Sequence, residues 1–484
     1  MDPTVDNTAP EDDAADTRAY RSEAYVRTGE IPGLEDLFAS AARSAGVPVG
    51  DRSATDERHE SADDDDASAA APPMAKARGG ADHADDGGAR RPSFRRRHPK
   101  LTVVGILVVI AMIPLGGTYA RAMTKEGNES AMARTAGWAR DMHLGFLVDW
   151  AEQRMYSEDQ FAKGGAPDPE VFKPVETTSA PATTAGGGQG TAAPSTAPQI
   201  PHTNPPSRVP SPVTPPAEGE GEWAPAGQLI NGLPGVYTTK VRPNAEHSSL
   251  TVFLAWVDPK LTNIELMPGT DLPGGDWSLP HFITPELCPK AIMATNGMFR
   301  MDQARGGYWA EGKEPFKLHD GAASLVFLKD GRVDVAQWGR DYTAADFDKI
   351  KAVRQNLELM VDDGKPSPDL NSDKDWGALL KNVYFVWRSG YGVTADGALL
   401  YAGGPALTPA DLARTLQGAG AVRVMEGDIN PEWVTANLFS VDPATGQCKG
   451  TKGLEGSEDK GGMRQPANRY LSTDKRDFVA VFAK

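Results

Sequence analysis

The chain has 484 residues, including 39 prolines and 51 glycines, and a formal net charge of −16. The acidic balance argues against a nucleic-acid-binding protein, and two cysteines are too few for a disulfide-rich scaffold or a cysteine-rich zinc site. Residues 1–89 contain 21 acidic and 8 basic side chains, with much Ala, Gly, Ser and Pro between them. Such a segment buries too little apolar surface to offset its ordering entropy, so we predict a disordered acidic tail.

A basic segment and an apolar segment follow the tail. Residues 90–100 contain six Arg and Lys side chains and no acidic one, and residues 101–120 carry no charge. A helix over residues 101–121 rises ~1.5 Å per residue and spans about 30 Å, the thickness of a bilayer core. Because basic flanks remain in the cytoplasm, we predict a single-pass protein with a cytoplasmic N-terminus and an extracellular C-terminal part. The alternative is a buried helix of a soluble protein.

Two spacers are predicted after the membrane span. Over residues 122–162, large apolar residues recur from Trp138 to Met155, which predicts an extracellular helical stalk whose apolar stripe packs against a neighbour or lies on the membrane surface. Residues 163–221 contain 13 prolines among Thr, Ala and Gly without a hydrophobic period. This composition is typical of an extended linker.

Residues 222–484 have the size of one catalytic domain, and their apolar segments are short and end at turn residues. One helix is indicated by Thr408 as N-cap, Pro409 at the first position and Asp411 completing a capping box. We predict an α+β fold with mixed β-sheets and few helices in this domain. The predicted strands cover residues 250–257, 263–267, 291–295, 356–361, 422–425 and 478–482, and hairpins turn at residues 330–331 and 396–397.

Polar side chains stand where several of these strands end. Glu426 and Asp428 follow an apolar strand and, as residues i and i+2, share one face, which suits acid–base chemistry or a cation. Arg388 ends another apolar strand, where a guanidinium requires an acidic partner or an anionic ligand. Structural alternatives remain open, because Asn296-Gly297 is also a turn signature and Arg354 suits a surface ion pair. The same alternative applies to Asp362-Asp363-Gly364, which is another turn signature.

Several blocks of this domain resemble the phosphodiester glycosidase family, which includes the enzyme that uncovers mannose 6-phosphate. Residues 294–299 (ATNGMF) are similar to its NG-x-F motif, and residues 353–364 to its middle block. Residues 387–397 resemble its R-S/T-x-x-G block before an Asp-Gly hairpin, and residues 408–430 its last helix and N-L-D-G-G strand end. Order and spacing agree over residues 233–484, and the whole layout resembles the actinobacterial membrane-anchored branch.

The resemblance implies hydrolysis of a sugar-1-phosphate diester of a cell-envelope glycan, through an oxocarbenium-like transition state that a carboxylate stabilises. Guanidinium groups would bind the phosphate. No metal or other cofactor is required, although the carboxylates leave room for a divalent cation. The expected partners are an envelope sugar phosphate or polysaccharide and the lipid bilayer, with no nucleic acid. The catalytic candidates are Asp428, Glu426 and Asn296, and the substrate-binding candidates are Arg388, Arg354, Asp363 and Asn430.

The chain departs from the family at one strand end. Residues 426–431 read EGDINP where the family has N-L-D-G-G-G-S, so Asp428 matches but the glycines that would let the backbone approach a sugar phosphate are replaced. This difference favours an alternative function, a non-catalytic glycan-binding or structural cell-wall protein. A regulator that acts through its acidic tail is a further alternative, but no kinase or DNA-binding motif supports it.

Both cysteines, Cys288 and Cys448, lie in the domain predicted to be outside the cell. Disulfides persist in oxidising compartments and are rare in the cytosol. We therefore predict a bridge between them, which requires Cα atoms within about 7 Å, and two free thiols are the alternative.

Overall fold

The computed structural model describes residues 113–125, 130–155, 161–174, 200–304, 306–372, 376–377, 385–442, 444–456 and 461–484. The predicted tail, the basic segment and residues 101–112 of the predicted membrane span lie outside this set. Residues 113–124 are helical. None of the helices among the described residues is both long enough and apolar enough to cross a membrane. Contacts divide the chain into Met1–Ala120 and Arg121–Lys484.

The predicted stalk forms two short helices rather than one. Helix α4 (Ala131–Asp141) begins after the N-cap Ser130, and α5 (Gly145–Met155) follows three residues later. His143, between them, has a φ of 59°, a left-handed conformation that interrupts helical hydrogen bonding. Phe146 and Trp150, one turn apart on α5, are 65% and 50% exposed.

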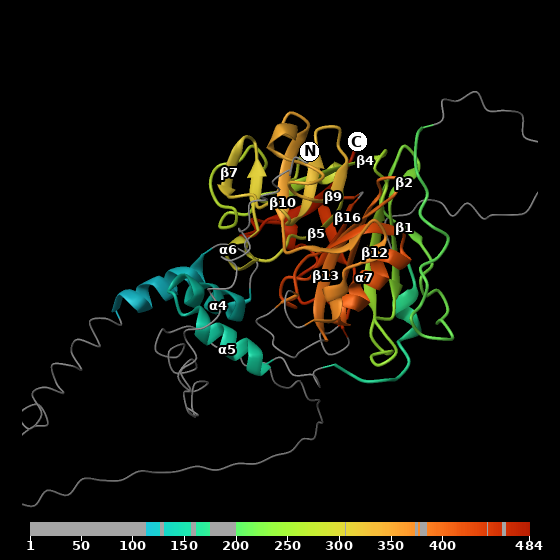
Figure 1. The fold of residues 1–484 in the computed structure, drawn as a ribbon, viewed down its shortest axis with the longest axis horizontal. Coiled ribbons are helices and arrows are strands. Elements are labelled where there is room, and N and C mark those ends of the chain that lie inside the picture. The colour runs from blue at the N-terminus through green and yellow to red at the C-terminus, as the bar shows by residue number, and fades with distance from the viewer. Residues whose placement is uncertain are drawn as a thin grey trace, which may run out of the picture. The chain divides into compact units, whose positions relative to one another are not determined.

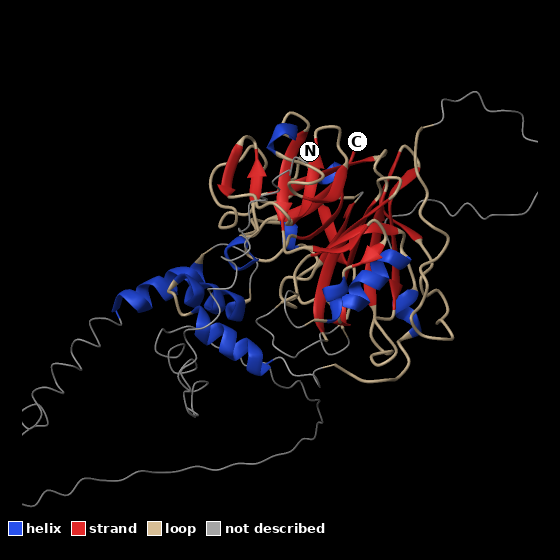
Figure 2. Cartoon of the chain, viewed as in Figure 1, coloured by secondary structure: helices blue, strands red, loops and turns tan. Residues whose placement is uncertain are grey.

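Antiparallel strands form three sheets, which Figures 1 and 2 show in the C-terminal part of the chain. The first contains, in order, β1 (Ala224–Ile230), β2 (Leu233–Val241), β3 (Val252–Val257), β14 (Leu399–Leu407), β13 (Val386–Thr394), β15 (Ala421–Glu426), β11 (Leu359–Asp362) and β12 (Lys365–Pro366). The second contains β7 (Lys313–Phe316), β6 (Tyr308–Ala310), β10 (Ile350–Gln355), β8 (Ala323–Leu328) and β9 (Val333–Gln337). The third contains β17 (Cys448–Lys452), β16 (Ala436–Val441), β5 (Ala291–Asn296), β18 (Phe478–Ala483) and β4 (Thr262–Met267).

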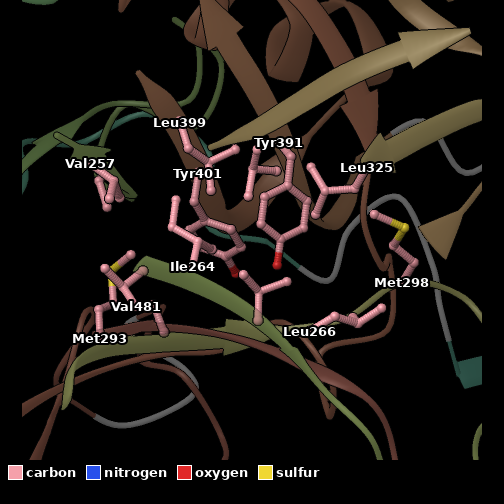
Figure 3. Close-up of a cluster of buried hydrophobic side chains, with 14 of the residues drawn as sticks. Val257, Ile264, Leu266, Met293, Met298, Leu325, Tyr391, Leu399, Tyr401 and Val481 are labelled. Carbon is pink, nitrogen blue, oxygen red and sulfur yellow. The ribbon is translucent and has the colours of Figure 1, made fainter. Parts of the chain in front are cut away.

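One apolar core joins the three sheets (Figure 3). It combines Tyr401 of the first sheet with Leu325 of the second and Val481 of the third. A second core lies under α7 (Pro409–Gly418), whose Leu412 and Leu416 are fully buried. Burying a leucine side chain contributes about 1.5–3 kcal/mol, so both cores hold the strand ends in fixed positions.

The predicted α+β class with few helices is confirmed, and the pairs between named strands are antiparallel. The predicted strands correspond to β3, β4, β5, β11, β15 and β18, although β11 begins at Leu359 rather than at residue 356. Both hairpins are present, with positive φ at Gly331 and Gly397. Helix α7 has the predicted capping box, in which Thr408 and Asp411 bond to each other's backbone N–H groups.

Part of the predicted linker packs on the domain. Glu220 is fully buried and forms an ion pair with Arg242, whose Nη2 lies 2.8 Å from its Oε2. Val209 is buried in the core under α7, and Ser248 donates to the carbonyl of Gly165 at 2.9 Å. Ordered contacts with the sheet therefore begin before residue 222, where the sequence predicted the domain to start.

The predicted disulfide is confirmed. Cys288 and Cys448 are bonded, with Cα atoms 5.8 Å apart. The bond connects the short helical turn before β5 to the first residue of β17. Because β5 ends at Asn296, the bond secures the strand that leads to the candidate site.

Candidate active site

Three strand ends of two sheets meet at the candidate site. Strand β5 of the third sheet ends at Asn296, while β13 and β15 are neighbours in the first sheet. In the β13–β15 register Gly390 is opposite Glu426, so Arg388 and the residues after Glu426 lie near each other. The apolar residues Val424 and Met425, both fully buried, fix the end of β15 in the core.

Arg388 and Glu426 form a buried ion pair. Their exposures are 3% and 0%, and Arg388 Nη1 donates to Glu426 Oε1. The guanidinium also donates from Nη1 to the carbonyl of Trp376 at 2.9 Å and from Nε to that of Leu407 at 3.0 Å. Glu426 Oε2 has no hydrogen-bond partner among the described residues. Arg388 is therefore directed into the protein, where it holds one oxygen of Glu426.

Burial raises the pKa of Glu426 to about 7. The positive charge of Arg388 opposes this rise, and the negative charge of Asp428 adds to it. At neutral pH the protonated and ionised forms of this carboxyl group are both populated, which is the condition that a general acid or base requires.

Asp428 is the second buried carboxylate. Its Oδ2 accepts from Arg476 Nη2 at 3.1 Å, and its Oδ1 accepts from the backbone N–H of Asn430 at 2.9 Å. Burial raises the pKa of Asp428, while Arg476 opposes the rise. The Arg476 guanidinium also lies 4.4 Å from the ring centroid of Trp433. Arg476 was not among the predicted site residues, although it lies two residues before the closing strand β18.

Ser389 connects the predicted residues. Its Oγ accepts from Asn296 Nδ2 at 2.9 Å and from the backbone N–H of Asp428 at 2.9 Å. Ser389 also follows Arg388 directly in β13, so Asn296, Arg388 and Asp428 belong to one cluster with Glu426. Ser389 was not predicted as a site residue, although it occupies the S/T position of the R-S/T-x-x-G block that residues 387–397 resemble.

All hydrogen-bonding capacity of the Asn296 amide is used inside the protein. Its Oδ1 accepts from Tyr401 at 2.7 Å and from the backbone N–H of Thr435 at 3.1 Å, and its Nδ2 donates to Ser389 and to the carbonyl of Gly297. An asparagine side chain offers about four such bonds, so Asn296 positions Ser389 rather than presenting a free group. Gly297 is required by a close approach, because a Cβ there would lie 2.5 Å from the carbonyl oxygen of Asp477.

Arg354 belongs to a neighbouring buried pair. Its Nε lies 2.7 Å from Asp477 Oδ2, and both side chains are 1% exposed. Its remaining donors bond to the carbonyls of Gln355 and Phe299, each at 2.6 Å. These contacts join the segment after β5 to the residue before β18, and Asp477, the partner of Arg354, also lies close to Gly297.

The candidate Asp363 and its neighbour Asp362 lie away from the carboxylate pair. Gly364 donates to the carbonyl of Val422, so Asp362 and Asp363 lie at the opposite end of β15 from Glu426. Asp363 is exposed in a turn with φ of 49°, and Asp362 pairs with the exposed Arg340 at 3.0 Å.

Asn430 follows Asp428 in the chain and forms a turn, in which its Oδ1 accepts from the N–H of Glu432 at 2.9 Å. Over the described part of the chain, no group of three or more His, Cys, Asp or Glu side chains is arranged to hold a metal ion. In this cluster the partners of the Glu426 and Asp428 carboxylates are the guanidinium groups of Arg388 and Arg476.

No protein-family model and no curated protein sequence matches the chain. One similar solved structure is the zebrafish N-acetylglucosamine-1-phosphodiester alpha-N-acetylglucosaminidase catalytic domain auto-inhibited by pro-peptide, with a TM-score of 0.35 and 12% identity over 54% of this chain and 88% of that chain. Another is a hypothetical protein from Synechocystis, with a TM-score of 0.29 and 12% identity over 54% of this chain and 64% of that one. At these low scores neither similarity bears on activity.

Proposed function

We propose that the protein is an extracellular phosphodiester glycosidase, anchored in the membrane, that hydrolyses a sugar-1-phosphate diester of a cell-envelope glycan. Two buried carboxylates support this proposal: Glu426 and Asp428 lie at one strand end, and each is held by a guanidinium. Glycoside hydrolysis characteristically uses such a pair, one to exchange a proton and one to face the developing positive charge.

The two carboxylates suit different roles. The free Oε2 of Glu426 and its pKa of about 7 suit the removal of a proton from water. Asp428, fixed by Arg476 and by the N–H of Asn430, supplies the negative charge for the oxocarbenium-like carbon. A phosphate leaving group is already a weak base, so it needs little protonation. Arg388 would then orient Glu426 rather than bind phosphate.

A second candidate function is a non-catalytic glycan-binding or structural cell-wall protein on the same fold. It is favoured by the burial of both carboxylates, because a substrate has to open the cluster before it reaches them. It is also favoured by Arg388 and Arg354, whose guanidinium groups donate to backbone carbonyls and carboxylates of the protein.

Incubation of the full chain with a panel of sugar-1-phosphate diesters distinguishes the two functions. We expect the wild type to release free sugar. In Glu426→Gln and in Asp428→Asn the rate of release should fall about 100-fold or more, the range that acid–base groups contribute. Asp348→Asn, which changes an exposed carboxylate, is the matched control. Glycan binding without sugar release by the wild type would instead support the non-catalytic function.

The membrane topology is also a proposal, supported by the uncharged residues 101–120 and the basic residues 90–100. Protease added to spheroplasts should cleave the chain after residue 121 and leave residues 1–90 intact. The reverse pattern would remove the extracellular location and, with it, the envelope substrate.

A further inference from the structure

A cavity of about 400 Å³ lies beside the loop that follows Asp428. We propose that it binds the phosphate-bearing part of an anionic glycan, an inference that rests on the function proposed for the neighbouring carboxylates. Its volume is in the range of small-molecule binding sites. The polar side chains in its wall include Glu432, Lys452, Arg464 and Gln465.

The charge of the cavity favours an anion. The Glu432 carboxylate accepts from Arg464 Nη1 at 3.1 Å and from Gln465 Nε2 at 3.2 Å, so its charge is balanced inside the wall. Lys452 Nζ donates to the carbonyl of Met463 at 2.9 Å, and no carboxylate among the described residues lies within ion-pair distance of it. An ammonium has three donors, which leaves two for a ligand. Among the described residues, the Lys452 ammonium therefore has no carboxylate within ion-pair distance, and the Glu455 carboxylate instead accepts from the backbone N–H of Lys452 at 3.0 Å.

The cavity is connected to the carboxylate site by a short hydrogen-bonded loop. Asp428 accepts from the N–H of Asn430, and Asn430 accepts from the N–H of Glu432, whose carboxylate is part of the cavity wall. The four residues from Asp428 to Glu432 span at most about 14 Å. A short oligosaccharide is therefore long enough to reach from the cavity to Asp428. The phosphate of a diester bound near Lys452 would therefore place its sugar toward the carboxylates.

The amide and carboxylate in the wall favour a glycan phosphate over a bare anion. Gln465 is 3% exposed and Glu432 is partly exposed, and such groups donate to and accept from sugar hydroxyls. A neutral sugar would leave Lys452 without a counter-charge, so the phosphate is expected to contribute most of the discrimination.

Calorimetric titration of the full chain with glucose 1-phosphate and with glucose tests the proposal. We expect glucose 1-phosphate to bind and glucose to bind more weakly. In Lys452→Met the affinity for glucose 1-phosphate should fall about 10- to 100-fold, which is what one charge-assisted hydrogen bond contributes. Lys452→Arg keeps the positive charge and should retain binding. This result would show that the loss in Lys452→Met comes from the missing charge and not from misfolding. Lys449→Met is the matched control, because Lys449 is an exposed lysine of the same strand.

Equal losses in Lys452→Met and Lys449→Met, equal binding of glucose and glucose 1-phosphate, or no binding of either probe would overturn the proposal. Binding of glucose 1-phosphate and hydrolysis of the diesters are measured separately, which separates this proposal from the proposed function. Binding that depends on Lys452 without hydrolysis of any diester would leave the cavity site standing and refute the hydrolase. Hydrolysis of a diester by Lys452→Met with an unchanged KM would refute the cavity site and leave the hydrolase standing.

Discussion

The buried carboxyl group of Glu426 should make the stability of the protein fall as pH rises. Its pKa is about 7 in the folded protein and 4.5 as the ordinary value of a glutamate. Below pH 4.5 both states hold the proton, and the stabilising contribution is fully present. As pH rises toward 7 the unfolded chain releases its proton while the folded protein keeps it, so stability is lost through this range.

The size of the effect follows from the two pKa values. A rise from 4.5 to about 7 corresponds to about 3 kcal/mol in total, of which about 2–3 kcal/mol is lost between about pH 5 and pH 8. The variant Glu426→Gln cannot titrate. It also leaves the Arg388 guanidinium without its carboxylate, so its stability should be lower at every pH.

Urea unfolding of wild type and Glu426→Gln at a series of pH values measures the difference in slope. We expect the gap between the two free energies of unfolding to narrow by about 2–3 kcal/mol from about pH 5 to pH 8. Other titrating groups are common to both proteins and cancel in the difference. Parallel pH profiles would show that Glu426 titrates normally, and they would remove the basis for its acid–base role.

Three further predictions concern the buried contacts around the site. Arg354→Met should cost about 3–5 kcal/mol in urea unfolding, because the Asp477 carboxylate stays buried without its partner, and adding Asp477→Leu should restore part of the loss. Asn296→Ala should cost about 2–4 kcal/mol, since four buried groups lose a hydrogen-bond partner, and a change below 1 kcal/mol would contradict the positioning role. Reducing the Cys288–Cys448 bond should lower the free energy of unfolding by up to about 5 kcal/mol for a separation of 160 residues, and a thiol assay should find no free thiol before reduction.

Features encoded over a few adjacent residues were predictable from the sequence. The turns at Gly331 and Gly397 and the capping box of α7 depend on local backbone chemistry, and the structure has all three. The buried strand β10 was missed, because its Arg354 and Gln355 interrupt the apolar pattern. Both side chains are buried through contacts with distant parts of the chain, which no local pattern encodes.

The strand-end residues show the same limit at the site. The sequence predicted Asn296, Arg388, Glu426 and Asp428 as site residues because each lies near the end of a predicted strand, where rigid scaffolds place chemistry. It left open whether a buried guanidinium would meet a carboxylate or a ligand. That choice depended on partners 38 residues away for Arg388, 48 for Asp428 and 123 for Arg354.

These internal pairs decide where a phosphate group can be recognised. Arg388 is balanced by Glu426, and Arg476 by Asp428, so with both carboxylates ionised the cluster has no net charge with which to attract an anion. Even when Glu426 is protonated, the Arg388 guanidinium still donates to the backbone carbonyls of Leu407 and Trp376. A cation outside these pairs is therefore needed, and Lys452, in the cavity beside the same loop, has an ammonium without a carboxylate partner among the described residues. The carboxylates and the phosphate-binding charge would then occupy adjacent parts of one site.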